Sequence, residues 1–186
     1  MSQNKRTING IIRRALADAR SSAPPARVYA LVDPARDDRI AAELASPGQR
    51  SICLYGVDLP GTLVAVAPHL VWLSGNSRFG QLFASQGRGR AWGMLLASHA
   101  PAETIATHLA SLTRARLPDG RTVLFRFYDP RVMRRYLPTC TPDELDRVFG
   151  PIEAFLIEEP GGAQQEYARE DRTLQRRDPR WELWLD

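Results

Sequence analysis

The side chains that could carry out chemistry are few, and they are scattered along the chain. The three histidines, His69, His99 and His108, form neither an HExxH motif nor a pair with cysteine at metal-ligand spacing. Cys53 and Cys140 are not in a CxxC arrangement, and neither has a local setting that would activate its thiol. No GxSxG sequence marks a nucleophilic serine. The sequence therefore predicts no catalytic residue, no metal and no cofactor, and favours a protein that is not an enzyme.

The histidines and cysteines have ordinary structural interpretations. His108 shares a helix face with apolar residues, which is typical of a satisfied boundary or core residue. His69 opens an apolar segment and His99 follows one, so either could be exposed at the end of a strand. Two free and partly buried thiols are favoured over a disulfide between Cys53 and Cys140.

A stretch from Leu117 to Tyr128 combines a turn with a strand. The dipeptide Asp119-Gly120, preceded by proline, predicts a turn, because proline fixes φ and glycine accepts positive φ. Apolar and other side chains then alternate over residues 123–128, which indicates a strand. Arg126 lies within this strand, where it must face solvent or pair with an acid.

The next residues begin a helix. Asp129 can cap a helix whose first residue is Pro130, where a missing N–H costs nothing. We expect Arg126, Asp129 and Arg131 to form a local network of ion pairs around this cap. We favour this structural role over direct contact with a partner.

The glycine-rich segment Gly87–Gly93 has a superficial likeness to a dinucleotide-binding loop. It precedes a predicted strand, whereas the phosphate-binding geometry needs glycines that follow a strand and open a helix. Arg88 and Arg90 could contact nucleic-acid phosphates, but few aromatic residues lie nearby. A charged surface loop is the favoured interpretation.

Charge leaves one alternative function open. The 186 residues carry a net charge of +4, with a pI of about 9.5, and Lys5 is the single lysine among the basic residues. A basic protein could associate with nucleic acid, although the basic residues are mostly interspersed with acids. No window resembles a membrane span, and the N-terminus does not resemble a secretory signal, so we expect a cytoplasmic protein.

The order of elements predicts an α/β fold: a single domain with a central mixed β-sheet flanked by helices, plus a short C-terminal helical tail. Residues 1–26 contain an amphipathic helix, predicted over 6–21, residues 27–157 form the core domain, and residues 158–186 form the tail, with a polar helix from 163. Strands are predicted at 27–32, 51–55, 69–73, 92–98, 123–128 and 152–157. Helices are predicted at 35–45, 77–84, from 101, from 130 and from 142.

The last residues contain two tryptophans, Trp181 and Trp184. They either dock back onto the domain or present a binding hot spot to a partner. Docking is favoured, because exposed tryptophans promote aggregation.

Several sequence motifs, in this order, resemble the type VI secretion effector chaperones, also called TEC or Tap adaptors, whose core domain is of unknown function. The motifs are YALVDP at 29–34, SICLY at 51–55, APHLVWL at 67–73, WGMLLAS at 92–98, HL at 108–109, LPDG at 117–120, FRFYDPR at 125–131 and FGPI at 149–152. Within them, Asp33, Trp92, Arg126, Asp129 and Arg131 are the signature residues. Two departures are His69, where the family often has tyrosine, and a chain that is short after the core.

The resemblance implies a non-enzymatic function. Such adaptors bind a cognate toxic effector in the cytoplasm of a Gram-negative bacterium, often through its PAAR or N-terminal region, and help to load it onto the VgrG spike. The resemblance therefore implies an effector and VgrG as partners, and neither a membrane nor nucleic acid.

One surface is a candidate for effector binding. The hypothesis places it beside the 77–90 segment and the C-terminal tail, where arginines and aromatic residues, which are common in protein interfaces, are expected to be exposed. The predicted contacts are Arg78, Phe79, Arg88, Arg90, Trp181 and Trp184.

Overall fold

The computed structural model describes residues 26–56, 60–73, 77–117 and 119–178. The main sheet contains β1 (Arg27–Val32), β2 (Ser51–Cys53), β3 (His69–Trp72), β4 (Gly93–Ser98), β7 (Ala154–Glu158), β8 (Gln164–Glu170) and β9 (Thr173–Arg177). A separate hairpin is formed by β5 (Arg114–Arg116) and β6 (Thr122–Leu124). The helices are η1 (Pro34–Arg36), α2 (Asp38–Leu44), α3 (Gly61–Val64), α4 (Arg78–Gln86), α5 (Ala102–Leu112), α6 (Pro130–Tyr136), η2 (Leu137–Thr139) and α7 (Pro142–Phe149). No helix in these ranges is long and apolar enough to cross a membrane.

The α/β class is confirmed, but the prediction of a mixed sheet is wrong, because neighbouring strands of the described sheet are antiparallel. The strand order is β2-β3-β1-β4-β7-β8-β9, and every neighbouring pair is antiparallel. The connection through α2 joins β1 to β2, and these two strands run in the same direction. The connection through α4 joins β3 to β4, which are also parallel to each other. A third strand lies between the members of each pair, so no parallel strands become neighbours, as in a split β-α-β unit.

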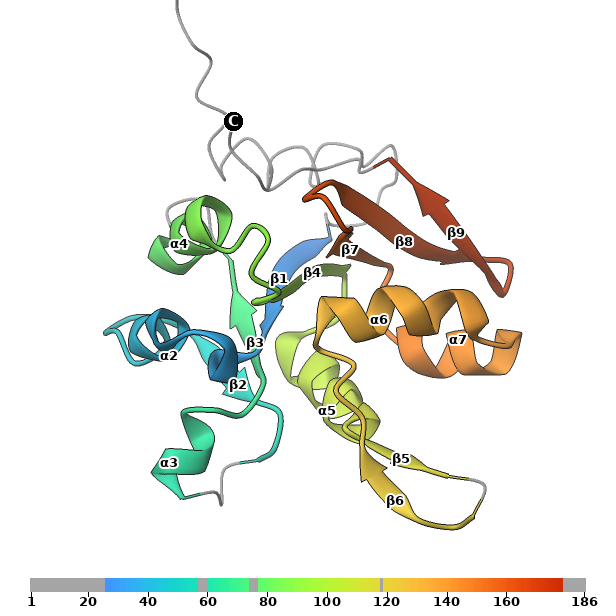
Figure 1. Cartoon of the computed structure of the whole chain (residues 1–186), viewed down its shortest axis with the longest axis horizontal. Helices are drawn as coiled ribbons and strands as arrows, with labels where there is room; N and C mark the ends of the chain where they lie inside the picture. Colours follow the sequence, from blue (N-terminus) through green and yellow to red (C-terminus); the bar gives the residue numbers. More distant parts are fainter. Residues whose placement is uncertain (1–25, 57–59, 74–76, 118, 179–186) are drawn as a thin grey trace, which may run out of the picture.

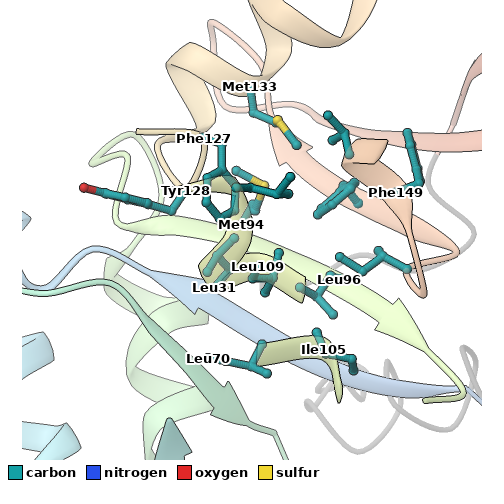
Figure 2. Packing of buried hydrophobic residues seen from close by; sticks show 14 of the residues in the cluster. Leu31, Leu70, Met94, Leu96, Ile105, Leu109, Phe127, Tyr128, Met133 and Phe149 are labelled. Carbon is teal, nitrogen blue, oxygen red and sulfur yellow. The ribbon is translucent and has the colours of Figure 1, made fainter. Parts of the chain in front are cut away.

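The sheet is covered by helices on both faces (Figure 1). Along β1, Val28, Ala30 and Val32 face α2 and α4, whereas Tyr29 and Leu31 face α5, α6 and α7. Figure 2 shows the second of these cores, where Ile105 and Leu109 of α5 approach Leu31, Leu70 and Leu96 from the sheet, with Phe127, Met133 and Phe149 above. A strand that is buried on both faces reads as a continuous apolar run, which explains why β1 is easily recognised in the sequence.

The helix starts predicted from local signals are confirmed. The carboxylate of Asp129 accepts a hydrogen bond from the Arg131 backbone N–H, and Pro130 is the first residue of α6. At α7, the Thr141 hydroxyl accepts from the Glu144 backbone N–H while the Glu144 carboxylate accepts from the Thr141 backbone N–H. This reciprocal pair is the capping box that the sequence predicts.

The predicted C-terminal helix is wrong over the described residues. Residues 164–177 form the hairpin of β8 and β9, in which Glu170 pairs with Thr173. The two-residue loop consists of Asp171 and Arg172, with φ values of 47° and 61°. Two positive φ values define a type I′ turn, whose twist suits a hairpin. Arg172 pairs with Asp146 of α7, which ties the hairpin to the core. The predicted helix of 6–21 lies outside the described residues.

The predicted strand at 123–128 is shorter than expected. β6 ends at Leu124, and the ladder closes when the Phe125 N–H donates to the Thr113 carbonyl at 2.8 Å. Phe127 and Tyr128 then turn into the core. The chain leaves the ladder here because these aromatic side chains gain burial under α5 and α6, which a two-stranded hairpin cannot provide.

The histidines and cysteines hold structural positions. His69 is buried, and a ring nitrogen lies 2.8 Å from the Ala67 carbonyl, so the exposed position considered for it is wrong. Burial lowers the pKa of His69 despite this backbone contact. His108 bonds to the Val148 carbonyl at 3.0 Å, as a satisfied boundary residue should. Cys53 and Cys140 are free and partly buried, which confirms that prediction.

Candidate partner-binding surface

The signature residues gather where β1 ends and β4 begins, and we call them the signature cluster. Arg126 donates from Nη2 to Oδ2 of Asp33 at 2.6 Å, and the second oxygen of Asp33 accepts from the Ala35 N–H at the start of η1. The Asp33 side chain is 2% exposed, whereas that of Arg126 is 46% exposed. Arg126 therefore pairs with Asp33 and not with Asp129, which corrects the predicted network in that detail.

Asp129 forms the second half of the signature cluster. Its carboxylate accepts from the backbone and the guanidinium of Arg131, with an Nη2–Oδ2 distance of 2.6 Å. Burial acts to raise the pKa of Asp129, but the hydrogen bonds from Arg131 outweigh it and the pKa is lowered. The predicted cap and the Asp129–Arg131 ion pair are thus present.

Trp92, a member of the signature cluster, and the glycine that follows it hold the start of β4 against the end of β1. The Trp92 carbonyl accepts from the Asp33 N–H at 2.8 Å, and the buried indole ring lies beneath the guanidinium of Arg39. Gly93 has a φ of 157°, and a Cβ there would lie 2.0 Å from the Leu31 carbonyl oxygen. Only glycine allows β1 and β4 to approach so closely here.

A second contact joins the neighbouring aromatic residues. The Tyr128 hydroxyl lies 3.0 Å from the Tyr55 hydroxyl, and the Arg126 guanidinium lies over the Tyr128 ring at 5.7 Å. Burial, followed by this hydrogen bond, raises the pKa of Tyr55. The hydroxyl therefore stays protonated and acts as a structural bridge between the β2 end and the α6 start.

Arg88 and Arg90 lie in the turn between α4 and β4, as predicted for a charged loop. The Gly89 N–H donates to the Glu158 carboxylate at 2.6 Å, which fixes the turn against the end of β7. Arg90 lies 3.7 Å from Asp37. A groove of about 170 Å³ runs between this turn, the start of α6 and the β7–β8 turn, with Arg131 and Arg134 in its wall.

Arg78 lies at the other end of α4, beside a larger groove. We call this the Trp72 groove; it has a volume of about 340 Å³ and is lined in part by Glu43, Pro47, Arg50, Trp72, Leu73 and Arg78. The Arg50 guanidinium lies 4.6 Å from the centre of the Trp72 ring, and Arg78 is 3.5 Å from Glu43. The groove thus combines an aromatic ring, aliphatic side chains and two guanidinium groups.

Of the six predicted contact residues, the four that the structure describes do not form one surface. Because α4 has nine residues and is about 13 Å long, Arg78 is separated from Arg88 and Arg90 by the length of the helix. Phe79 is fully buried against the sheet, so the prediction that it offers a contact surface is wrong. Its place on the apolar face of α4 explains the burial. Trp181 and Trp184 lie outside the described residues.

Sequence reasoning missed Trp72 and Arg50 as members of a groove. Trp72 stands in an apolar run, which predicts a core residue, and it does pack edge-on against Tyr29 at 5.9 Å. Arg50 precedes β2 and comes over the ring only because β2 pairs with β3. No local sequence signal reports that pairing.

Comparison with known proteins identifies the family. The family described as a domain of unknown function (DUF4123) matches residues 28–147, more than half of the chain. The chain belongs to this family. Searches of curated proteins and of solved structures returned no match. Among the described residues, no group of three or more histidine, cysteine or acidic side chains could hold a metal ion.

Proposed function

We propose that this chain is a non-enzymatic adaptor that binds a toxic effector of a type VI secretion system in the cytoplasm and helps to load it onto the VgrG spike. The observation that carries the proposal is membership of the DUF4123 family over residues 28–147. This range includes all five residues of the signature cluster and most of the motifs that resemble the effector chaperones.

The signature cluster supports a scaffold role. Asp33 and Asp129 are both buried, and each accepts hydrogen bonds from an arginine and from a backbone N–H group. Carboxylates held in this way stabilise a turn and a helix start. A rigid scaffold of this kind is what an adaptor needs to present a docking surface.

The Trp72 groove is the surface that we assign to the effector. Aromatic residues and arginine are enriched in protein interfaces, and a few such residues supply most of the binding energy. Trp72 offers a half-buried ring, and Arg50 and Arg78 place two positive charges at the groove against the single acid of Glu43. The groove therefore suits an effector segment with an apolar anchor and acidic neighbours.

The test is co-expression of the full chain with the toxin encoded in the same gene cluster, followed by co-purification and a binding measurement. Arg78→Glu should weaken binding by about tenfold, because it places a negative charge at the groove. The Arg78 side chain is 79% exposed, so the fold should persist. Arg135→Glu, which changes an exposed arginine of α6, is the matched control and should bind like the wild type.

The outcomes separate the function from the site. If the wild-type chain never retains the toxin, the adaptor function is wrong. If wild type and Arg78→Glu retain it equally, the function stands and the groove assignment is wrong. The net charge of +4 favours one alternative, a nucleic-acid accessory protein; a DNA gel shift at low salt that disappears steeply as salt rises would support it.

A further inference from the structure

The β5–β6 hairpin projects from the body of the molecule beyond α5 (Figure 1). β5 pairs with β6 alone among the described strands, so the hairpin is a two-stranded sheet of its own. Leu124 is 57% exposed and Val123 is 36% exposed, although both are apolar. The hairpin is therefore an exposed apolar element, whereas most of the other large apolar side chains in the described residues are at least partly buried.

The hydrogen-bond pattern shows which backbone groups face outward. The Phe125 N–H donates to the Thr113 carbonyl, and the Leu117 N–H donates to the Arg121 carbonyl, both at 2.8 Å. Antiparallel pairs alternate, so Ala115 and Val123 form the hydrogen-bonded pair between these two. The N–H and C=O groups of Thr122 and Leu124 point away from β5 and form an open edge, as those of Arg114 and Arg116 do on the opposite side.

The two edges differ in charge. The β5 edge carries Arg114 and Arg116, and charged residues of this kind protect an edge strand from further pairing. The β6 edge consists of Thr122, Val123 and Leu124, which are β-prone and uncharged. The edge that remains open to strand addition is therefore that of β6.

The arginines of β5 also lack acids to balance them. Neither Arg114 nor Arg116 forms an ion pair with any residue in the described ranges, in contrast to Arg126 and Arg131. Cross-strand pairing places Arg114 opposite Leu124 and Arg116 opposite Thr122, so all four side chains share one face of the hairpin. A strand added beside β6 would lie about 10 Å from β5, and long arginine side chains can approach acids on such a strand.

We propose that the β6 edge binds an extended, acidic segment of a partner protein as a third antiparallel or parallel strand. Backbone hydrogen bonds to Thr122 and Leu124 would provide the pairing, and Arg114 and Arg116 would select acids on the shared face. The proposal goes beyond the adaptor function and does not depend on it, because the hairpin is separate from the Trp72 groove and the chemistry of the segment defines the partner.

The experiment uses the full chain and synthetic capped peptides as probes. The first probe alternates Glu and Val over seven residues, the second replaces every Glu with Lys, and the third carries Pro at its centre, which removes a ladder N–H. Binding is followed by fluorescence anisotropy, and exchange of the Thr122 and Leu124 amide protons is followed by NMR. The Glu/Val peptide should bind and slow the exchange of those two amides, and the other two peptides should bind at least about tenfold more weakly.

Two variants decide whether the hairpin is responsible. Arg114→Glu combined with Arg116→Glu should reverse the preference toward the Lys/Val peptide, while Arg135→Glu should leave it unchanged. Leu124→Lys places a protecting charge on β6 and should abolish binding of either peptide. Circular dichroism checks the fold of each variant. The proposal is wrong if no peptide binds, or if the Arg114→Glu/Arg116→Glu variant keeps the wild-type preference. It is also wrong if the Thr122 and Leu124 amides stay unprotected, or if the chain instead dimerises through this edge.

Discussion

The β5–β6 hairpin is followed directly in sequence by the two arginines of the signature cluster, and the two regions use arginine in opposite ways. In the signature cluster, Arg126 and Arg131 are each held by a buried carboxylate. In the hairpin, Arg114 and Arg116 have no acid partner within the described ranges, and an exposed leucine stands beside them. A guanidinium that is paired with a buried acid stabilises the fold, whereas one that is left unpaired on an open edge is available to another molecule.

The largest effect on stability is expected from Asp33→Ala in the signature cluster. The substitution removes a buried charge-assisted hydrogen bond and the cap of η1, and should lower the free energy of unfolding by about 2 kcal/mol. Urea denaturation measures this difference. Arg114→Ala in the hairpin is the matched comparison and should change stability by less than about 0.5 kcal/mol. Equal losses in the two variants would contradict the distinction between the regions.

A smaller effect is expected from Asp129→Asn, and it should depend on pH. Asparagine keeps the helix cap but loses the charge that pairs with Arg131, which should cost about 1 kcal/mol at neutral pH. The folded-state pKa of Asp129 lies below the ordinary value of 3.8, so the carboxylate stabilises the fold above that value and ceases to do so as pH falls through the lowered pKa.

The difference in the free energy of unfolding between wild type and Asp129→Asn should therefore have its full size near neutral pH and become smaller below pH about 4. Urea denaturation across this range measures it. Asp119→Asn is the control, because Asp119 pairs with Arg121 in the same Asp-X-Arg geometry but on the surface. The free energy of unfolding of Asp119→Asn should be almost the same as that of wild type at every pH. If Asp119→Asn loses as much stability as Asp129→Asn, burial is not what distinguishes the two ion pairs.

The smallest effect is expected in the hairpin itself. Arg116→Ala and Leu124→Thr should each shift the free energy of unfolding by less than about 0.5 kcal/mol, because neither side chain packs into a core. Thermal unfolding followed by circular dichroism provides the measurement. If either variant lowers the free energy of unfolding by more than about 1 kcal/mol, the hairpin contributes to the stability of the fold and is not a free element that a partner can bind.

The sequence predicted those features whose causes are local. The Asp129-Pro130 helix start, the capping box at Thr141 and the apolar run of β1 each depend on residues a few positions apart. The partner of Arg126 could not be found in this way, because Asp33 lies 93 positions away and meets it only after the sheet has formed. The Trp72 groove escaped prediction for the same reason, since it needs β2 beside β3.

The C-terminal hairpin was missed for a different reason. A two-residue hairpin loop is usually recognised from Asn-Gly or Asp-Gly, which accept positive φ. Here the loop is Asp171-Arg172, and arginine gives no such signal. The alternation in β8 is also weak, because Glu166 is buried beside apolar residues and is paired with Arg177.

The position of β1 has a consequence for how the protein is made. β1 lies in the interior of the sheet, and its two neighbours, β3 and β4, both come much later in the chain. Pairing between strands so far apart in the sequence is slow, because the entropy of closing a long loop is lost before the stabilising contacts form. During synthesis, one edge of residues 27–32 stays open until Trp72 has been made, and the other stays open until the chain has been extended through Ser98. A strand that ends buried on both faces is thus made early and must wait for both of its partners.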